Sequence, residues 1–388
     1  MPEIDATLVA RARTAAAAIA PLSARIEAER RLPAEAVRAL VDARVFKLLV
    51  PRAYGGAEAS VATVLAVIEE IARCDGSAGW CAMIGATSGL MCAFLDEQMA
   101  REVYGGSDAI TCGVFAPMGR AVRVDGGYRV SGRWPFASGC EHSAWRMGGA
   151  LVVGDTPDVL PSGAPNVRSM LFRADETRVL DTWDTSGLRG TGSHDLEVTD
   201  VVVPTARSFS LITDRPKHAH AASLYALPFF GVLAAGVSAV ALGIARGAID
   251  AIVDLANAKT PMGAKRSIAN REMVQLHVAE AEGKVRSARA FLREAVDEAI
   301  GEATERGAAT TRARALVRIA ASHAAMEAAS AVDLAYSAGG ATSIYTKSPL
   351  QRCFRDVHVA TQHAMVSASS ATLAGRVLLG LESDISTL

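Results

Sequence analysis

Aromatic side chains are scarce in this chain of 388 residues: Phe, Trp and Tyr make up 5% of it, although 50% of the residues are hydrophobic. A chain rich in alanine and poor in aromatic residues favours closely packed helices over a large sheet protein. The six cysteines form no Cys-x-x-Cys pair, and no histidine cluster has metal-ligand spacing. We therefore expect a mostly helical, cytoplasmic protein with reduced thiols and no metal site.

The sequence also lacks an excess of either charge. Its 40 Lys and Arg residues against 41 Asp and Glu residues give a formal net charge of −1, so no global field attracts nucleic acid or an anionic membrane. Residues 1–20 lack the basic start and continuous apolar core of a signal peptide. The apolar stretch from Leu224 to Ile244 is interrupted by Pro228 and by glycines, which favours a buried helix over a membrane span.

Hydrophobic periodicity divides the chain into three parts. Residues 1–108 have helical spacing, residues 109–217 contain short β-branched or alternating runs between turn residues, and residues 218–388 contain helical segments longer than 25 residues. Asp125-Gly126-Gly127 predicts a hairpin turn in the middle part. The fold class is therefore mostly α with a β middle domain: an N-terminal helical domain, a small β-barrel or sandwich, and a C-terminal four-helix bundle.

These patterns also predict the individual elements. The N-terminal helices include residues 61–74, 78–94 and 96–104, and the strands are residues 110–114, 119–124, 127–134, 145–153, 167–172 and 196–203. The four bundle helices are residues 224–259, 268–301, 310–338 and 349–381.

Residues 133–139 combine two aromatic side chains, one hydroxyl group and one glycine. Trp134, Phe136 and Ser138 could contact a flat, heteroatom-rich ligand through stacking and hydrogen bonds. The same composition is compatible with a strand that ends in a turn. A second segment, Asp184 to Asp195, contains three glycines and several hydroxyl groups. It is either a phosphate-binding loop or a hairpin.

Combined with the order of the three domains, the segment Asp184 to Asp195 resembles the D-x-x-G-x-R-G-T-x-S segment of the acyl-CoA dehydrogenase superfamily. The resemblance extends over essentially the whole chain and implies the fold of that superfamily. Its further motifs are Arg266 followed by Gln275, the Gly339-Gly340 turn after Tyr336, and Arg352 with Arg355-Asp356.

Two departures from the dehydrogenases point to another branch of the superfamily. Dehydrogenases commonly carry a carboxylate base just after the Gly-Gly turn, but residues 341–345 contain no Asp or Glu. Gly113 to Gly119 stands where their G-S-D segment is usual. Three segments resemble instead the two-component flavin-dependent monooxygenases: Asp75 to Trp80, Gly132 to Gly139, and Arg355-Asp356 followed seven residues later by His363.

The resemblance implies the oxygenase component of a two-component monooxygenase. Such a protein receives FMNH2 or FADH2 from a separate NAD(P)H-dependent flavin reductase, through contact or through flavin diffusion alone. It uses O2, through a C4a-hydroperoxyflavin, to hydroxylate a small aromatic or heteroaromatic substrate. The family's bundle is buried between subunits, which implies a homotetramer.

The resemblance also implies roles for single residues. The catalytic residues are Ser138, near flavin N5, and His363, near the peroxide. Helical spacing predicts that Arg352, Asp356, Val359 and His363 form one stripe. The other flavin-binding residues are Trp134, Phe136, Gly339, Gly340 and Arg266, the last from a neighbouring subunit.

The substrate is less constrained by the sequence. Phenol hydroxylases of this branch often place a histidine in the apolar helix after the tryptophan, whereas this chain has Ile84 to Gly89, so an indole-like ring is as compatible as a phenol. The candidate substrate residues are Trp80, Thr87, Ser88 and His142, the last equally compatible with a surface position. Three alternatives stay open: an FAD-dependent acyl-CoA dehydrogenase with its base on another helix, an N- or S-oxidising monooxygenase, and a catalytically inert scaffold.

Overall fold

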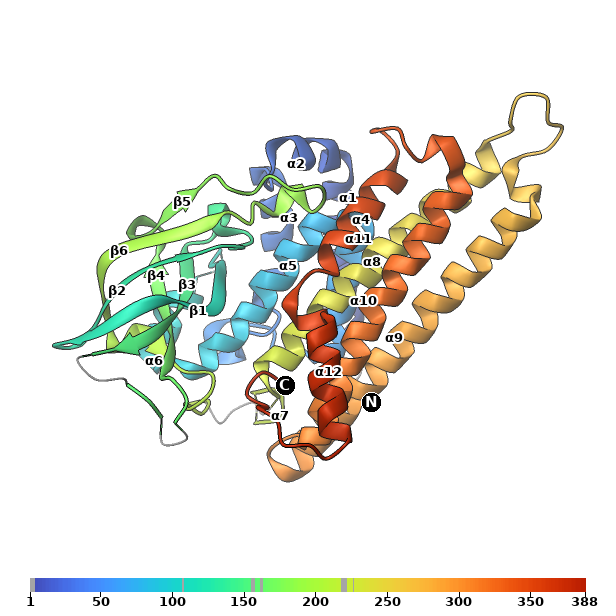
Figure 1. The fold of residues 1–388 in the computed structure, drawn as a ribbon. Coiled ribbons are helices and arrows are strands. Elements are labelled where there is room, and N and C mark those ends of the chain that lie inside the picture. Colours follow the sequence, from blue (N-terminus) through green and yellow to red (C-terminus); the bar gives the residue numbers. More distant parts are fainter. Residues whose placement is uncertain (1–3, 107, 155–157, 161–162, 218–221, 226) are drawn as a thin grey trace.

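The chain folds into a helical part, a β-sheet and a helix bundle in the computed structural model, which describes residues 4–388 except 107, 155–157, 161–162, 218–221 and 226. Figure 1 shows the sheet at one end of the molecule and the bundle at the other. Helix α5 (Gly76–Ser88) lies between them. This arrangement confirms the fold class expected from the sequence.

The N-terminal helices are built around α5. Its residues are almost all buried, as expected for a helix that is apolar on every side. Asp75 caps its first turn by accepting a hydrogen bond from Ala78 N–H (2.9 Å). The surrounding helices are α1 (Ala6–Ile19), α2 (Ser23–Glu29), α3 (Ala34–Asp42), α4 (Val61–Cys74) and α6 (Glu97–Tyr104).

The middle domain is a seven-stranded sheet in the order β5-β6-β2-β1-β3-β4-β7. The predicted hairpin turn is confirmed, because Val124 pairs with Gly127 across it. The two strands predicted over residues 110–124 form one strand with irregular register between Val114 and Gly119. The strands are β1 (Thr111–Val124), β2 (Gly127–Trp134), β3 (Trp145–Val153), β4 (Val167–Arg173), β5 (Arg178–Leu180), β6 (Asp195–Pro204) and β7 (Ser208–Phe209).

The helices predicted over residues 268–301 and 310–338 correspond to α9 and α10. The helix predicted over residues 224–259 begins only at Phe229, after Pro228, and the single helix predicted over residues 349–381 is wrong. Helix α11 ends at Ala360, and His363 has extended backbone (ψ 134°) at the start of the short helix η12 (Ala364–Val366). The His363 side chain accepts a hydrogen bond from Met365 N–H, a local bond that competes with a continuing helix. His363 is therefore not on a helical stripe with Asp356. The bundle comprises α7 (Ala222–Tyr225), α8 (Phe229–Ala258), α9 (Glu272–Arg306), α10 (Thr311–Gly339), α11 (Pro349–Ala360) and α12 (Ala368–Leu378).

Two apolar segments, Gly76–Phe94 and Phe229–Ala258, are long and apolar enough to cross a membrane. In both, 89% of the apolar window is buried inside the protein. Packing against neighbouring helices thus accounts for their composition, as expected for residues 224–244 from the sequence.

Candidate active site

Trp80 lies where the three parts of the molecule meet. Its Nε1 donates a hydrogen bond to Ser138 Oγ of the β domain (2.9 Å). Its ring packs edge-on against the ring of His363, with centroids 5.5 Å apart. Ser138 and His363, the two predicted catalytic residues, therefore contact the same indole.

The loop that carries Ser138 runs alongside the glycine-rich segment 184–195. Ala137 N–H donates to His194 O (3.0 Å), and Gly139 N–H donates to Thr191 O (2.9 Å). Gly139 has a positive φ of 73°, which suits glycine and allows the chain to turn here. These contacts place Ser138 Oγ 2.7 Å from Ser193 Oγ.

The buried hydroxyl groups around Ser138 form a chain of hydrogen bonds with one direction. Thr191 Oγ1 donates its only proton to Leu188 O (2.9 Å), so it must accept from Ser193 Oγ (2.6 Å). Ser193 then has no proton for Ser138 and accepts from it instead. Because Ser138 also accepts from Trp80, it keeps one free acceptor position and no free proton.

His363 is a neutral hydrogen-bond donor in this arrangement. Its Nδ1 accepts from Met365 N–H (3.2 Å), so the neutral imidazole carries its proton on Nε2. Burial, and to a lesser extent the nearby charge of Arg318, lower the pKa of His363 to about 4. Within the described part of the chain, Nε2 makes no hydrogen bond.

The segment 184–195 connects strands β5 and β6, which pair through Leu180 and Asp195, so it is the long loop of a hairpin. Helix α11 holds this loop in place. Arg355 donates to Ser186 O (2.5 Å), and the Asp356 carboxylate accepts from Leu188 N–H (2.6 Å).

Asp356 joins all three parts of the molecule. It is 5% exposed and lies on α11, and a Cβ at Gly76 would come within 2.9 Å of its Oδ2. Glycine at position 76 thus allows the start of α5 to approach this carboxylate. Burial raises the pKa of Asp356 to about 7, although the Leu188 N–H opposes that shift.

The predicted contact between Trp134 and a flat ligand is contradicted by its burial. Its indole is 0% exposed, and Nε1 donates to Gly149 O (2.7 Å). A Cβ at Gly119 or Gly148 would come within 2.4 or 2.5 Å of the ring. Trp134 is therefore the centre of the β-domain core, because small residues on neighbouring strands make room for it.

Phe136 has the opposite character. Its side chain is 68% exposed, and its backbone has a φ of 67°, which is rare for a bulky residue. The ring of Trp183 packs edge-on against it, with centroids 6.2 Å apart. An exposed aromatic side chain on strained backbone, two residues from Ser138, is a candidate ligand contact.

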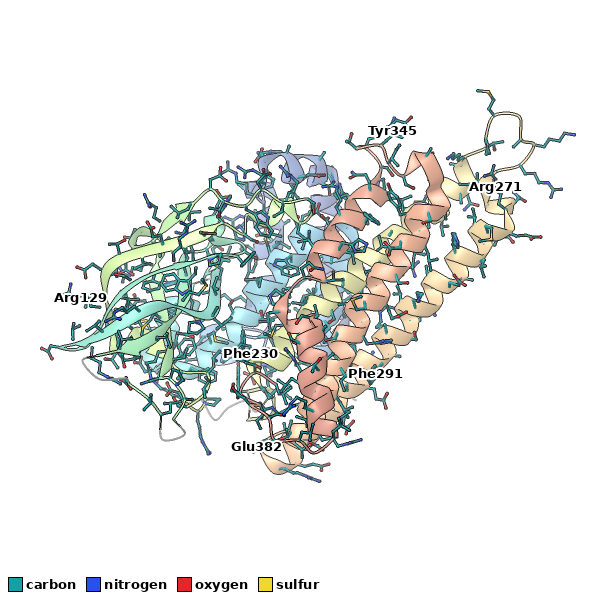
Figure 2. The ribbon with its side chains drawn as sticks, in the orientation of Figure 1. Arg129, Phe230, Arg271, Phe291, Tyr345 and Glu382 are labelled. Carbon is teal, nitrogen blue, oxygen red and sulfur yellow. The ribbon has the colours of Figure 1, made fainter. Side chains whose placement is uncertain are left out.

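Arg266 and the Gly339-Gly340 turn lie at the end of the bundle away from the sheet. Arg266 is exposed in the connection between α8 and α9, and the turn follows α10. Figure 2 shows this end, marked by Arg271 and Tyr345. Gly340 has a φ of 57°, and nothing lies within 4 Å of the position that a Cβ would take. The single chain does not bring these residues together with Ser138.

The remaining predicted substrate residues differ in what they can offer. Thr87 and Ser88 are buried, and their hydroxyl groups donate to the carbonyl oxygens of Met83 (2.8 Å) and Ile84 (2.7 Å) in their own helix. His142 is half-buried, with its ring 6.4 Å from that of Phe46, and burial lowers its pKa to about 4. It is therefore neutral at pH 7.

Sequence reasoning assigned no role to three residues at this junction. Thr191 and Ser193 are the Thr and the Ser of the D-x-x-G-x-R-G-T-x-S motif, so their place in that motif could have identified them as site residues. Arg318 lies among buried alanines of α10. A charged residue that interrupts the apolar face of a helix could have pointed to it.

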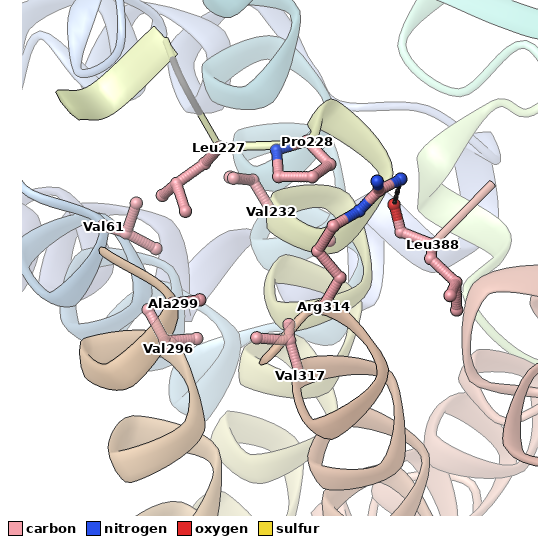
Figure 3. Close-up of a pocket in the computed structure, with 10 residues that line it drawn as sticks. Val61, Leu227, Pro228, Val232, Val296, Ala299, Arg314, Val317 and Leu388 are labelled. Carbon is pink, nitrogen blue, oxygen red and sulfur yellow. Dashed lines mark hydrogen bonds between the residues drawn. The ribbon is translucent and has the colours of Figure 1, made fainter. Parts of the chain in front are cut away.

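A small cavity lies away from these residues, among α8, α9 and α10. Its volume is ≈ 20 Å³, which is room for about one water molecule. Figure 3 shows Arg314 at its edge, donating to Leu388 O (3.0 Å). The cavity contains none of the predicted site residues and is too small for an aromatic ligand.

Two family models and several curated proteins match this chain. Residues 3–108 match the family described as "Acyl-CoA dehydrogenase, N-terminal domain", and residues 235–368 match "Acyl-CoA dehydrogenase, C-terminal domain". The chain is 34% identical to an indole-3-acetate monooxygenase of Pseudomonas putida, over 91% of this chain and 88% of that one.

Two further relatives agree with this match. An FADH2-dependent resorcinol hydroxylase, oxygenase component, of a Rhizobium species is 31% identical over 92% of this chain and 90% of that one. The crystal structure of the HsaA monooxygenase from Mycobacterium tuberculosis superimposes with a TM-score of 0.90, at 29% identity, over 99% of this chain and 100% of that one.

Proposed function

This chain belongs to the acyl-CoA dehydrogenase superfamily and, within it, to the flavin-dependent monooxygenases, and on that premise we propose that it is the oxygenase component of a two-component system. Its substrate is a small aromatic or heteroaromatic molecule. The observation that carries the proposal is the buried hydroxyl chain that ends at Ser138 beside Trp80 and His363.

The residues at the junction fit a reduced flavin. Ser138 offers one free acceptor position and no proton, and the N5 atom of a reduced flavin carries a hydrogen whereas that of an oxidised flavin does not. Ser138 would therefore accept from N5–H of FMNH2 or FADH2. When bound, the flavin supplies the electrons that activate O2 for transfer of one oxygen atom to the substrate.

His363 would act as a hydrogen-bond donor to the reacting oxygen. It is neutral at pH 7 and carries its free proton on Nε2. A neutral donor can stabilise developing negative charge on oxygen without releasing a proton beforehand. Packing against Trp80 fixes the orientation of the imidazole ring.

Other residues would hold the flavin at its edges. Phe136 would supply an aromatic surface, and Gly340 would let backbone approach the cofactor. Arg266 lies at the far end of the bundle, so it would reach a flavin phosphate only from a neighbouring subunit. The exposed apolar side chains of Met262, Ile344 and Tyr345 at that end support a homotetramer with shared sites.

The apolar wall of the substrate site would come from aromatic side chains on β1 and α8. Phe115 packs against Phe229 and Phe230, with ring centroids 4.4 and 6.2 Å away. Such a wall favours an aromatic substrate and excludes water from the reacting oxygen. The relatives are named for indole-3-acetate and resorcinol, which supports both an indole-like and a phenolic ring.

The acyl-CoA dehydrogenase alternative has less support at this junction. It needs a carboxylate base, whereas the buried carboxylates of Asp75 and Asp356 accept backbone hydrogen bonds from Ala78 and Leu188. Asp75 thus caps its own helix, and Asp356 joins α11 to the loop of the β domain. We further propose that a separate NAD(P)H-dependent reductase supplies the flavin, and that the protein works in the cytoplasm.

Oxygen incorporation tests the proposed function directly. The protein is mixed with photoreduced FMN or FAD under argon, then with 18O2 and either indole-3-acetate or resorcinol. A product that is heavier by one 18O atom supports the proposal. Bleaching of bound oxidised FAD by an acyl-CoA under argon would support the dehydrogenase alternative instead. If no flavin bleaches and no product forms with either ring, the inert scaffold is favoured.

A further inference from the structure

Arg318 is a positive charge inside the protein. It lies on α10 and is 2% exposed. Its guanidinium donates to Phe230 O (3.2 Å), Met365 Sδ (3.0 Å) and Ser370 Oγ (2.7 Å), all of which are uncharged. The group therefore contacts α8, the segment after His363, and α12.

Nothing in the described part of the chain neutralises this charge. No Asp or Glu there forms an ion pair with Arg318, and its Nε has no hydrogen-bond partner. Burial lowers the pKa of Arg318 to about 10, so the group is still charged at neutral pH. A buried charge without a counter-ion is unfavourable, because the lost hydration is not replaced.

A second unsatisfied donor lies one helical turn away. Ser322 is four residues after Arg318, hence on the same face of α10, and it is 7% exposed. Its hydroxyl group has no partner among the described residues. Arg318 Nε and the Ser322 hydroxyl group are thus two buried donors on one helix face that a ligand could satisfy.

The unpaired donors adjoin the proposed substrate site. Met365 contacts Arg318 through its sulfur atom and His363 through its backbone N–H. Phe230, whose carbonyl oxygen accepts from Arg318, also packs its ring against Phe115 and Phe229. Figure 2 shows Phe230 between the sheet and the bundle. An aromatic substrate along these rings would bring its substituent toward Arg318.

We propose that Arg318, assisted by Ser322, binds a carboxylate carried by the aromatic substrate, which makes the substrate class an aryl-alkanoic acid. The inference rests on the proposed function, because it takes the region around His363 as the substrate site. A guanidinium binds a planar carboxylate through two parallel N–H donors, and Nε is one donor available here. One buried positive charge balances one carboxylate, whereas a phosphate dianion would leave negative charge unpaired.

Arg318 could instead serve only to tie α8, η12 and α12 together. The two roles differ in what the charge does: a purely structural arginine affects every ligand alike, whereas a carboxylate anchor distinguishes an acid from its neutral amide. The test therefore compares indole-3-acetate with indole-3-acetamide, which has the same ring and nearly the same shape. Binding is measured by titration calorimetry on the full chain without flavin, so it does not depend on oxygenation.

The wild-type protein should bind the acid at least tenfold more tightly than the amide. Arg318→Gln should remove that preference and leave amide affinity within about twofold. Arg318→Lys, which keeps the charge, should keep part of the preference. Ser370→Ala is the matched control: it removes a hydrogen bond of the same guanidinium without changing charge, and should leave the preference intact.

Two results would overturn the inference. One is a wild-type protein that binds the acid no better than the amide, which needs no variant. The other is an Arg318→Gln protein that folds, by its circular dichroism, and loses affinity for both ligands alike. Tight, Arg318-dependent binding of the acid without 18O incorporation would refute the proposed function and leave the carboxylate site standing.

Discussion

Ser193→Ala should weaken the protein's preference for reduced over oxidised flavin. In the wild-type chain Ser193 takes the only proton of Ser138, so Ser138 can accept from reduced N5–H but cannot donate to oxidised N5. Without the Ser193 hydroxyl group, the Ser138 O–H is free to rotate and donate. The variant then forms a hydrogen bond with either oxidation state.

The size of the effect follows from one hydrogen bond. A neutral hydrogen bond contributes about 0.5–1.5 kcal/mol. The dissociation constant for oxidised flavin divided by that for reduced flavin should therefore fall roughly 2- to 12-fold. Ser193 is 3% exposed, and its loss leaves Thr191 without a donor. The free energy of unfolding should therefore fall by about 1–3 kcal/mol, with the fold retained.

The assay is anaerobic ultrafiltration with oxidised FMN or FAD and with the same flavin after photoreduction, which gives both dissociation constants for each variant. Thr185→Ala is the control: its hydroxyl group donates to Gly187 O (3.0 Å) in the same loop but takes no part in the chain to Ser138. It should leave the ratio unchanged. An unchanged or increased ratio in Ser193→Ala, with normal reduced-flavin binding, would show that the direction of the hydroxyl chain does not set flavin choice.

Three further predictions concern other parts of the site. His363→Ala should reduce the product formed per O2 consumed at least tenfold and raise H2O2 release. Its melting temperature should stay within a few degrees, because the side chain is only half-buried. Equal product per O2 in both proteins would contradict the role of His363. Asp356→Asn should flatten the pH dependence of the free energy of unfolding. In the wild-type protein the pKa of Asp356 is raised to about 7, so that free energy falls as the pH rises from about 4 to 7, by up to ~1.4 kcal/mol per pH unit. Urea unfolding between pH 5 and 8 measures the slope. Phe136→Gly should stabilise the fold by up to about 1 kcal/mol in the same assay, because glycine adopts a positive φ without steric strain. The variant should bind flavin more weakly. Equal or stronger flavin binding would show that Phe136 is not part of the cofactor site.

Much of the fold could be predicted because local patterns and tertiary structure agree. Val61–Cys74 has a capping serine before it and a helical apolar period, and β2 and β3 have the expected bounds. The misses have physical reasons. Strands β5 and β7 contain three and two residues, too few to show a period. The helix predicted over residues 349–381 failed because the His363 side chain bonds to local backbone.

The site was less predictable, since its contacts join residues far apart in sequence. Ser138 and Ser193 are 55 residues apart, and Trp80 is 58 residues from Ser138. No periodicity reports such pairs, so Ser138 could be proposed from its motif but not its hydrogen bonds. Trp134 was misjudged because stacking aromatics and core aromatics look alike in sequence. Its burial depends on Gly119 and Gly148 of two other strands, which become its neighbours only in the folded sheet.

The Asp356 junction has a consequence for how the chain is made. Leu188 and Asp356 are 168 residues apart, so at about 5–20 residues per second the ribosome would take about 8–34 s to supply the carboxylate after the loop emerges. During that interval the loop 184–195 and the start of α5 have no α11 to close against. We expect this loop to close only late in synthesis, and chaperone demand to be highest in that window.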